Sequence, residues 1–204
     1  MKTLLGQRLS FDWKIVTVTI FSTLALLVDA YQRLTPDKGL DRTILYLVIP
    51  LLIVLIVFRE KPSAYGFGFG DWKTGLIITC ISIVLIAPVL WLTAHGGAMK
   101  DYYRPQVNGL PWNTLIDLFG WEFFFRGFIL FTYARKFGAE ALWLQAVPFA
   151  LAHIGKPEIE AFSTIFGGFA FAWVAYRTRS FVYPFIIHWF VASFTIIVAT
   201  GLLG

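Results

Sequence analysis

Charged residues are scarce in this chain of 204 amino acids: they make up 14% of it, where a soluble domain has about 25%. Hydrophobic residues make up 58%, and they include 21 Phe and 8 Trp. A single core of this size cannot bury so much apolar surface, which excludes a water-soluble fold. The composition therefore predicts an integral membrane protein whose solvent is the lipid bilayer.

Cysteine is nearly absent as well. The single thiol, Cys80, lies within an apolar run, which excludes a disulfide framework and a cysteine-based zinc site. The net charge of +5 comes from Lys and Arg scattered over short loops, without a basic stripe. Nucleic acid is therefore not expected as a partner, and we interpret the positive charge as a signal for orientation in the membrane.

Long apolar runs bounded by charged residues indicate the architecture, because a membrane-spanning helix needs about 20 mostly apolar residues. They predict an all-α, polytopic transmembrane bundle of about seven helices around a polar intramembrane cavity, with residues 1–204 forming a single integral membrane domain. The first run lacks a small-residue cleavage pattern and is expected to remain as an anchor helix. The runs cover residues 13–31, 43–58, 74–94, 113–134, 139–154, 160–176 and 181–203.

The loops carry the orientation signal. Lys and Arg are more numerous in the N-terminal segment and in the second, fourth and sixth loops than in the other three loops. This asymmetry predicts a cytoplasmic N-terminus and a C-terminus on the opposite side. Residues 65–70 and 95–105 contain several Gly or Pro residues and are expected to be flexible or turn-like connections.

Ionisable side chains occur deep within three predicted spans. Glu122 and Arg126 lie in the fourth, His153 at the end of the fifth and His188 in the seventh. A charge in the middle of a bilayer costs roughly 2.5 to 3.5 kcal/mol, so these groups are expected to meet around a common water-accessible cavity. The third histidine, His95, stands beside a Gly-Gly turn and is expected to be an interfacial loop residue.

The deep polar groups allow several interpretations. Glu122 and Arg126 are four residues apart and share a helix face, so they form either a structural ion pair or a general base with its supporting cation. A glutamate and two imidazoles from three helices can hold an activated water together with oxyanion donors. They can also bind Zn²⁺, with Glu122, His153 and His188 as ligands.

Three short motifs along the chain, around Glu122, His153 and His188, resemble the CPBP (Abi) family of intramembrane proteases. This is the CAAX prenyl endopeptidase type, whose members are described as glutamic endopeptidases. The family pattern is Glu-Glu-x-x-x-Arg, then Phe-x-x-x-His, then His-x-x-x-Asn. The resemblance covers residues from about 65 to 195, including Gly-Phe-Gly-x-x-Asp-Trp-Lys-x-Gly before the third span and Arg-Thr-Arg-Ser-Phe before the last. Here the motifs read Trp121-Glu122-Phe-Phe-Phe-Arg126, Phe149-Ala-Leu-Ala-His153 and His188-Trp-Phe-Val-Ala192.

Two positions depart from the family pattern. The first Glu, to which the family's water-activating role is commonly given, is Trp121, and the Asn of the last motif is Ala192. A helix turns about 100° per residue, so Glu122 cannot take the place of residue 121 unless the helix rotates. Glu160 is interpreted either as a second carboxylate from another helix or as an exposed residue at a helix start, where acids favour the dipole.

The resemblance implies an intramembrane endopeptidase that cleaves a membrane-embedded or lipid-anchored protein, as a multi-pass protein of a prokaryotic inner membrane. Glu122, assisted by His153, would deprotonate a water, and His188 would stabilise the oxyanion. No cofactor is expected, and zinc is a variant of this hypothesis. A non-catalytic membrane scaffold or chaperone and a transporter or proton relay stay open, although the absence of inverted repeats counts against transport. The supporting residues would be Arg126, Glu160, Phe149 and Trp121.

Overall fold

The computed structural model describes residues 10–202, and every regular element in that range is a helix. This confirms the predicted all-α bundle of about seven helices. The N-terminal half consists of α1 (Trp13–Tyr31), α2 (Lys38–Thr43), η1 (Ile44–Val48), α3 (Ile49–Leu52), η2 (Ile53–Val57), η3 (Pro62–Tyr65), α4 (Trp72–Thr93), α5 (Gly97–Tyr103) and η4 (Arg104–Gly109). The remainder consists of α6 (Trp112–Glu122), η5 (Phe123–Ile129), α7 (Leu130–Phe137), η6 (Gly138–Glu140), α8 (Ala141–Leu144), α9 (Ala146–Leu151), α10 (Glu158–Thr178) and α11 (Val182–Thr200).

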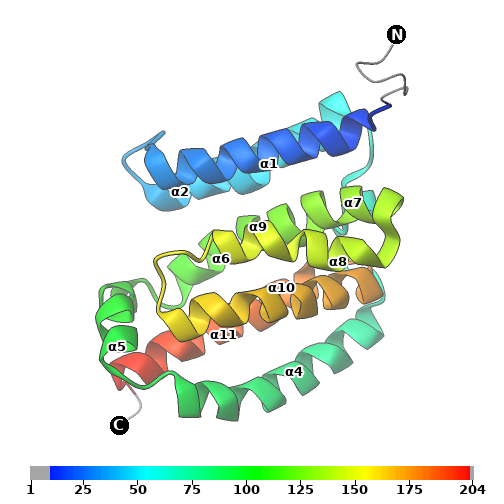
Figure 1. Ribbon diagram of the computed structural model, residues 1–204. Coiled ribbons are helices and arrows are strands. Elements are labelled where there is room, and N and C mark those ends of the chain that lie inside the picture. The colour runs from blue at the N-terminus through cyan, green and yellow to red at the C-terminus, as the bar shows by residue number, and fades with distance from the viewer. Residues whose placement is uncertain (1–9, 203–204) are drawn as a thin grey trace, which may run out of the picture.

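The helices are stacked side by side in layers (Figure 1). The continuous helix α2–η2 lies beside α1 at one side of the molecule, and α4 lies at the opposite side (Figure 1). Between them lie α6, α9, α10 and α11 (Figure 1). The basic residues before residue 10, which contribute to the charge asymmetry, and the last residue of the predicted run 181–203 lie outside the described residues.

Five helices of the described chain are long and apolar enough to cross a membrane, which supports an integral membrane protein. The predicted runs 113–134 and 139–154 are not among them. The first of these carries Asp117, Glu122 and Arg126, and the second is divided into the short helices η6, α8 and α9. The first segment lies in the middle of the bundle and gains stability from neighbouring helices, whereas the second leaves Trp143, Val147 and Leu151 exposed on its surface.

The segment from residue 95 to residue 105 corrects the sequence prediction of a turn-like connection. Most of it is helical, as α5 and the start of η4. Met99 and Tyr103 are one helical turn apart, and both are buried in a small apolar cluster with Ala94, Ile196 and Ala199. The spacing of two apolar residues in a short segment rich in Gly and Pro is too weak a signal to predict such a helix from the sequence.

The centre of the bundle is the continuous helix formed by α6, η5 and α7. The rings of Phe123, Phe124, Phe125 and Phe128 are completely buried there, packed against α1, the α2–η2 helix and η3. Directly after Glu122 the helix widens into the π-helical segment η5. Such segments are rare and occur frequently at functional sites.

Two loops that carried part of the family resemblance contact one another, although they are about 110 residues apart. The Thr178 carbonyl accepts a hydrogen bond from the Asp71 amide at 2.8 Å, and the Arg177 guanidinium donates to the Asp71 carboxylate at 3.1 Å. Gly70 has φ +48°, and a Cβ atom there would lie 2.0 Å from the Thr178 oxygen. Only glycine fits this approach, which fixes the start of α4 against the α10–α11 turn.

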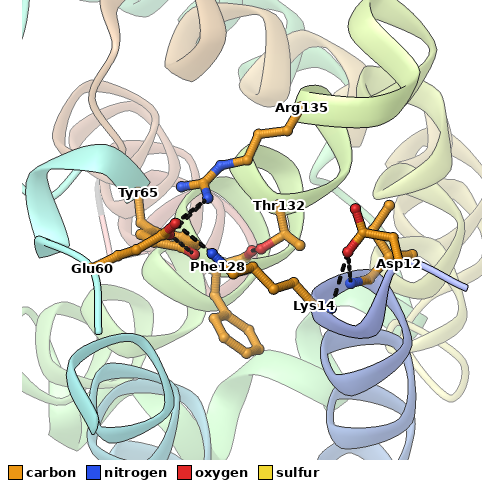
Figure 2. A network of polar contacts seen from close by, with 8 residues as sticks. Asp12, Lys14, Glu60, Tyr65, Phe128, Thr132 and Arg135 are labelled. Carbon is orange, nitrogen blue, oxygen red and sulfur yellow. Dashed lines mark hydrogen bonds and ion pairs between the residues drawn. The ribbon is translucent and has the colours of Figure 1, made fainter. Parts of the chain in front are cut away.

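At the same end of the bundle, Glu60 joins three segments (Figure 2). Its carboxylate accepts hydrogen bonds from Lys14 of α1 at 2.6 Å, from Tyr65 of η3 at 2.6 Å and from Arg135 of α7 at 2.7 Å. Burial alone would raise the pKa of Glu60, but the hydrogen bonds from Lys14, Tyr65 and Arg135 outweigh it and lower the pKa to about 2.

We expect Glu60→Gln to lower the free energy of unfolding by about 1 to 2 kcal/mol at pH 7, because the charge-assisted hydrogen bonds weaken. The pKa of Glu60 in the folded protein lies below its ordinary value of 4.5. The ionised carboxylate therefore stabilises the fold above about pH 4.5, and this stabilisation disappears as the pH falls towards 2. Thermal unfolding in detergent at pH 7 and pH 3 measures both effects.

The matched control is Glu140→Gln, because Glu140 is exposed and makes no ion pair with another described residue. It should unfold like the wild type at both pH values. A difference in the free energy of unfolding between wild type and Glu60→Gln that stays constant from pH 7 to pH 3 would contradict the lowered pKa of Glu60.

Candidate active site

The first and third motifs meet at a buried carboxylate. Glu122 is the last residue of α6 and has no exposed surface, and its Oε1 atom lies 2.6 Å from Nδ1 of His188 on α11. The Arg126 guanidinium, one turn further along, lies 3.3 Å from the same oxygen. Two of the predicted catalytic residues and the predicted supporting cation are thus in direct contact.

The second motif contributes an aromatic surface to this cluster. The guanidinium of Arg126 lies over the ring of Phe149, 3.9 Å from its centroid, and 5.2 Å from the centroid of Phe171 on α10. Among the described residues, the nitrogens of the guanidinium and Oε2 of Glu122 have no hydrogen-bond partner. The charge of Arg126 is therefore compensated by one carboxylate oxygen and by aromatic faces.

His153 follows α9 and is held by its own backbone. Its Nδ1 atom donates to the Phe149 carbonyl at 2.7 Å, since a carbonyl oxygen can only accept. The Trp121 ring lies beside the imidazole, with the centroids 5.9 Å apart. The side chain at position 121, where the family has its first Glu, therefore faces His153, whereas Glu122 faces His188.

A cavity of about 790 Å³ lies between α4, α10 and α11 and reaches both histidines. Residues that line it include His153, His188, Phe149 and Glu160, but not Glu122. The expectation that all three predicted catalytic residues face one cavity is therefore wrong for the carboxylate, which lies behind His188. The reason is that Glu122 has no exposed surface and its Oε1 atom is covered by His188 and Arg126.

Glu160 lies at the end of the cavity near α5. One of its carboxylate oxygens accepts a hydrogen bond from Tyr103, and the other accepts one from Lys156 at 2.6 Å. Neither predicted interpretation describes this arrangement fully, because Glu160 is engaged in a local network rather than exposed or bonded to His153. No sequence pattern pointed to Tyr103, since it lies in the segment expected to be turn-like.

The donor set for a metal ion is incomplete in the described part of the chain. No group of three or more His, Cys, Asp and Glu side chains lies close enough together to hold a metal ion within residues 10–202. Glu122 and His188 are hydrogen-bonded to one another, while His153 is hydrogen-bonded to the Phe149 carbonyl. The zinc variant on Glu122, His153 and His188 thus has no support in this geometry.

The fold and the site together define a class of protein. It is a helical membrane bundle with a buried glutamate, arginine and histidine beside a cavity. Residues 104–194, which contain all three motifs, match the model of the family described as "Rce1-like: Type II CAAX prenyl endopeptidase Rce1-like". This match confirms the predicted resemblance to the CAAX-type protease family. Comparisons with curated proteins and with solved structures gave no match.

We expect Arg126→Ala to lower the free energy of unfolding by about 3 to 5 kcal/mol, because the change leaves Glu122 buried without its cation. Thermal unfolding and gel filtration of the purified protein in detergent measure this. The matched control is Arg177→Ala, which removes a largely exposed ion pair with Asp71 and should cost no more than about 1 kcal/mol. An Arg126→Ala protein as stable as the control would show that the buried cation is not structural.

Proposed function

We propose that this protein is an intramembrane endopeptidase that hydrolyses a peptide bond in a membrane-embedded or lipid-anchored protein. The observation that carries the proposal is the 2.6 Å contact between Glu122 and His188 at the wall of a cavity that also exposes His153. Burying a carboxylate, a guanidinium and two imidazoles together is costly in a bilayer, and such groups mark functional sites there. The family match to type II CAAX prenyl endopeptidases supports the same reaction class.

Hydrolysis at this site needs only a water molecule and groups that move its proton. The catalytic set in the proposal is Glu122, His153 and His188, with Arg126 holding Glu122 in place. The low dielectric of a cavity inside the membrane strengthens the electrostatic effect of these groups on a developing charge. Phe149 and Trp121 pack against the His153 ring and fix its orientation.

The proposal is tested by cleavage of a natural membrane substrate by the wild type, Glu122→Gln and His153→Ala, each shown to be folded. We expect both variants to lose at least about 100-fold in activity, because each removes a group on which proton transfer from the water depends. Glu140→Gln is the matched control, because Glu140 is exposed and does not line the cavity, and it should cleave like the wild type. Undiminished cleavage by Glu122→Gln would remove Glu122 from the catalytic set.

The substrate-binding part of the proposal rests on the cavity between α4, α10 and α11. Gly167 of α10 lines it, and a Cβ atom there would meet no atom within 4 Å. Gly167→Leu should therefore fold normally but fill space that the substrate needs. We expect kcat/KM to fall by roughly tenfold or more.

Gly97→Leu is the matched control for Gly167→Leu. A Cβ atom at Gly97 also meets nothing within 4 Å, but Gly97 does not line the cavity. The control should cleave the substrate at the wild-type rate. Equal kcat/KM values for wild type, control and Gly167→Leu would place the substrate elsewhere.

A second candidate function is a non-catalytic membrane scaffold or chaperone, and one observation favours it. The side chain that faces His153 is the Trp121 ring, where the family pattern has a carboxylate. In that case the polar cluster would serve only to fix the helix packing. Absence of cleavage by the wild type, together with a gain of activity in Trp121→Glu, would identify this function.

The proposed orientation follows the charge asymmetry of the loops. Lys14, Lys61, Arg135 and Arg177 lie near the end of the bundle that carries the Glu60 network, and this end would face the cytoplasm of a prokaryotic cell. The opposite end, with α5 and Glu160, would face the other side of the inner membrane.

A further inference from the structure

The two histidines of the cavity differ in the group that accepts their Nδ1 hydrogen. His153 donates it to the Phe149 carbonyl, whereas the partner of His188 is the Glu122 carboxylate. An ionised carboxylate can only accept, so both imidazoles carry their hydrogen on Nδ1 and a lone pair on Nε2 when they are neutral. Among the described residues neither Nε2 atom has a hydrogen-bond partner, and both residues line the cavity.

The partner of Nδ1 decides which imidazole is the better proton acceptor. When Nε2 takes a proton the ring becomes a cation, and a carboxylate on Nδ1–H stabilises that cation more than a neutral carbonyl does. Glu122 supplies such a carboxylate to His188, 2.6 Å away in a site without exposed surface. His153 instead has an indole ring beside it, at the position of the family's first Glu.

Glu122 itself is poorly placed to accept a proton from water. Its Oε1 atom is occupied by His188 and Arg126, and its Oε2 atom is buried without a partner. Because Glu122 does not line the cavity, a water there reaches His188 before it reaches the carboxylate.

We propose that Nε2 of His188 is the proton acceptor of this site and that Glu122 is the positioning residue behind it. The inference rests on the proposed endopeptidase function and assigns the roles within it. The charged or titratable groups around His188 are Glu122 on α6, Arg126 on η5, and His153 and Lys156 after α9. Arg126 is paired with Glu122, and Lys156 is paired with Glu160, so the carboxylate is the group bonded to the His188 ring.

The reaction then balances without a cofactor. Nε2 of His188 takes one proton from the water as the water oxygen forms a bond to the peptide carbonyl carbon. The carbon–nitrogen bond breaks, and the leaving amine takes the proton from Nε2. The products are a carboxylic acid and an amine, and His188 returns to its neutral state. Nε2 of His153 accepts the second O–H of the same water and fixes its orientation.

The test compares variants that separate proton acceptance from hydrogen-bond donation. His188→Gln keeps an N–H donor of similar reach, which suffices for an oxyanion donor, but it has no basic nitrogen. We expect its kcat to fall at least about 100-fold with little change in KM. His188→Ala should lose as much and should regain activity when imidazole is added, with substituted imidazoles restoring it in the order of their basicity.

Glu122→Gln with the same added imidazoles is the matched control, because His188 still fills the space, and no activity should return. Substantial activity in His188→Gln would overturn the inference. The inference would also be overturned if added imidazoles restored no activity to His188→Ala, or restored it regardless of their basicity. A wild type that cleaves no substrate would instead refute the proposed function. If His188→Ala fails to fold, the kcat of folded His188→Gln decides the question.

Discussion

The buried charge of Arg126 constrains the rest of this structure. A guanidinium remains protonated in proteins, and this one has no exposed surface in a helix surrounded by phenylalanines. Three helices of the site contact that charge: α6 supplies Glu122, α9 supplies Phe149 and α10 supplies Phe171. The carboxylate that compensates the arginine also accepts from His188, so the requirement for neutralisation fixes the register between α6 and α11.

The register of the helices is also determined at the end of the bundle far from the site. Asp71 and the Thr178 carbonyl join the start of α4 to the α10–α11 turn, and Glu60 joins α1 to α7. In the helical parts of the site, a shift of one residue moves a side chain by about 100° around the helix axis. Contacts at the loops therefore control which histidine faces the carboxylate and which faces the tryptophan.

The sequence predicts the helices well where lipid imposes length and polarity. The runs 13–31, 74–94 and 160–176 agree with α1, α4 and α10 to within two residues at each end. It fails for α5, whose two buried side chains pack on α11, because no membrane requirement acts on so short a segment. Burial by neighbouring helices leaves a weaker trace in the sequence than burial in lipid does.

The site shows the same division between local and tertiary information. The spacing of Glu122 and Arg126 correctly predicts their ion pair, because both lie within one helix turn. The partner of each histidine depends on how three helices rotate against one another, and the motifs carry no information on that rotation. Tyr103 and Lys156, which bind Glu160, likewise come from segments that only the tertiary fold brings together.

Trp121 shows why this variant of the motif favours a histidine as the proton acceptor. Its ring packs against Tyr46 and Phe125, with centroids 5.2 and 5.0 Å away, and the Arg42 guanidinium lies 5.6 Å from the ring. The indole thus fills an aromatic space beside His153 in which a carboxylate would lie near the Arg42 guanidinium. Arg42 already forms ion pairs with Asp29 and Asp117. The carboxylate that supports a cavity histidine is therefore Glu122, which acts on the cavity only through the His188 ring.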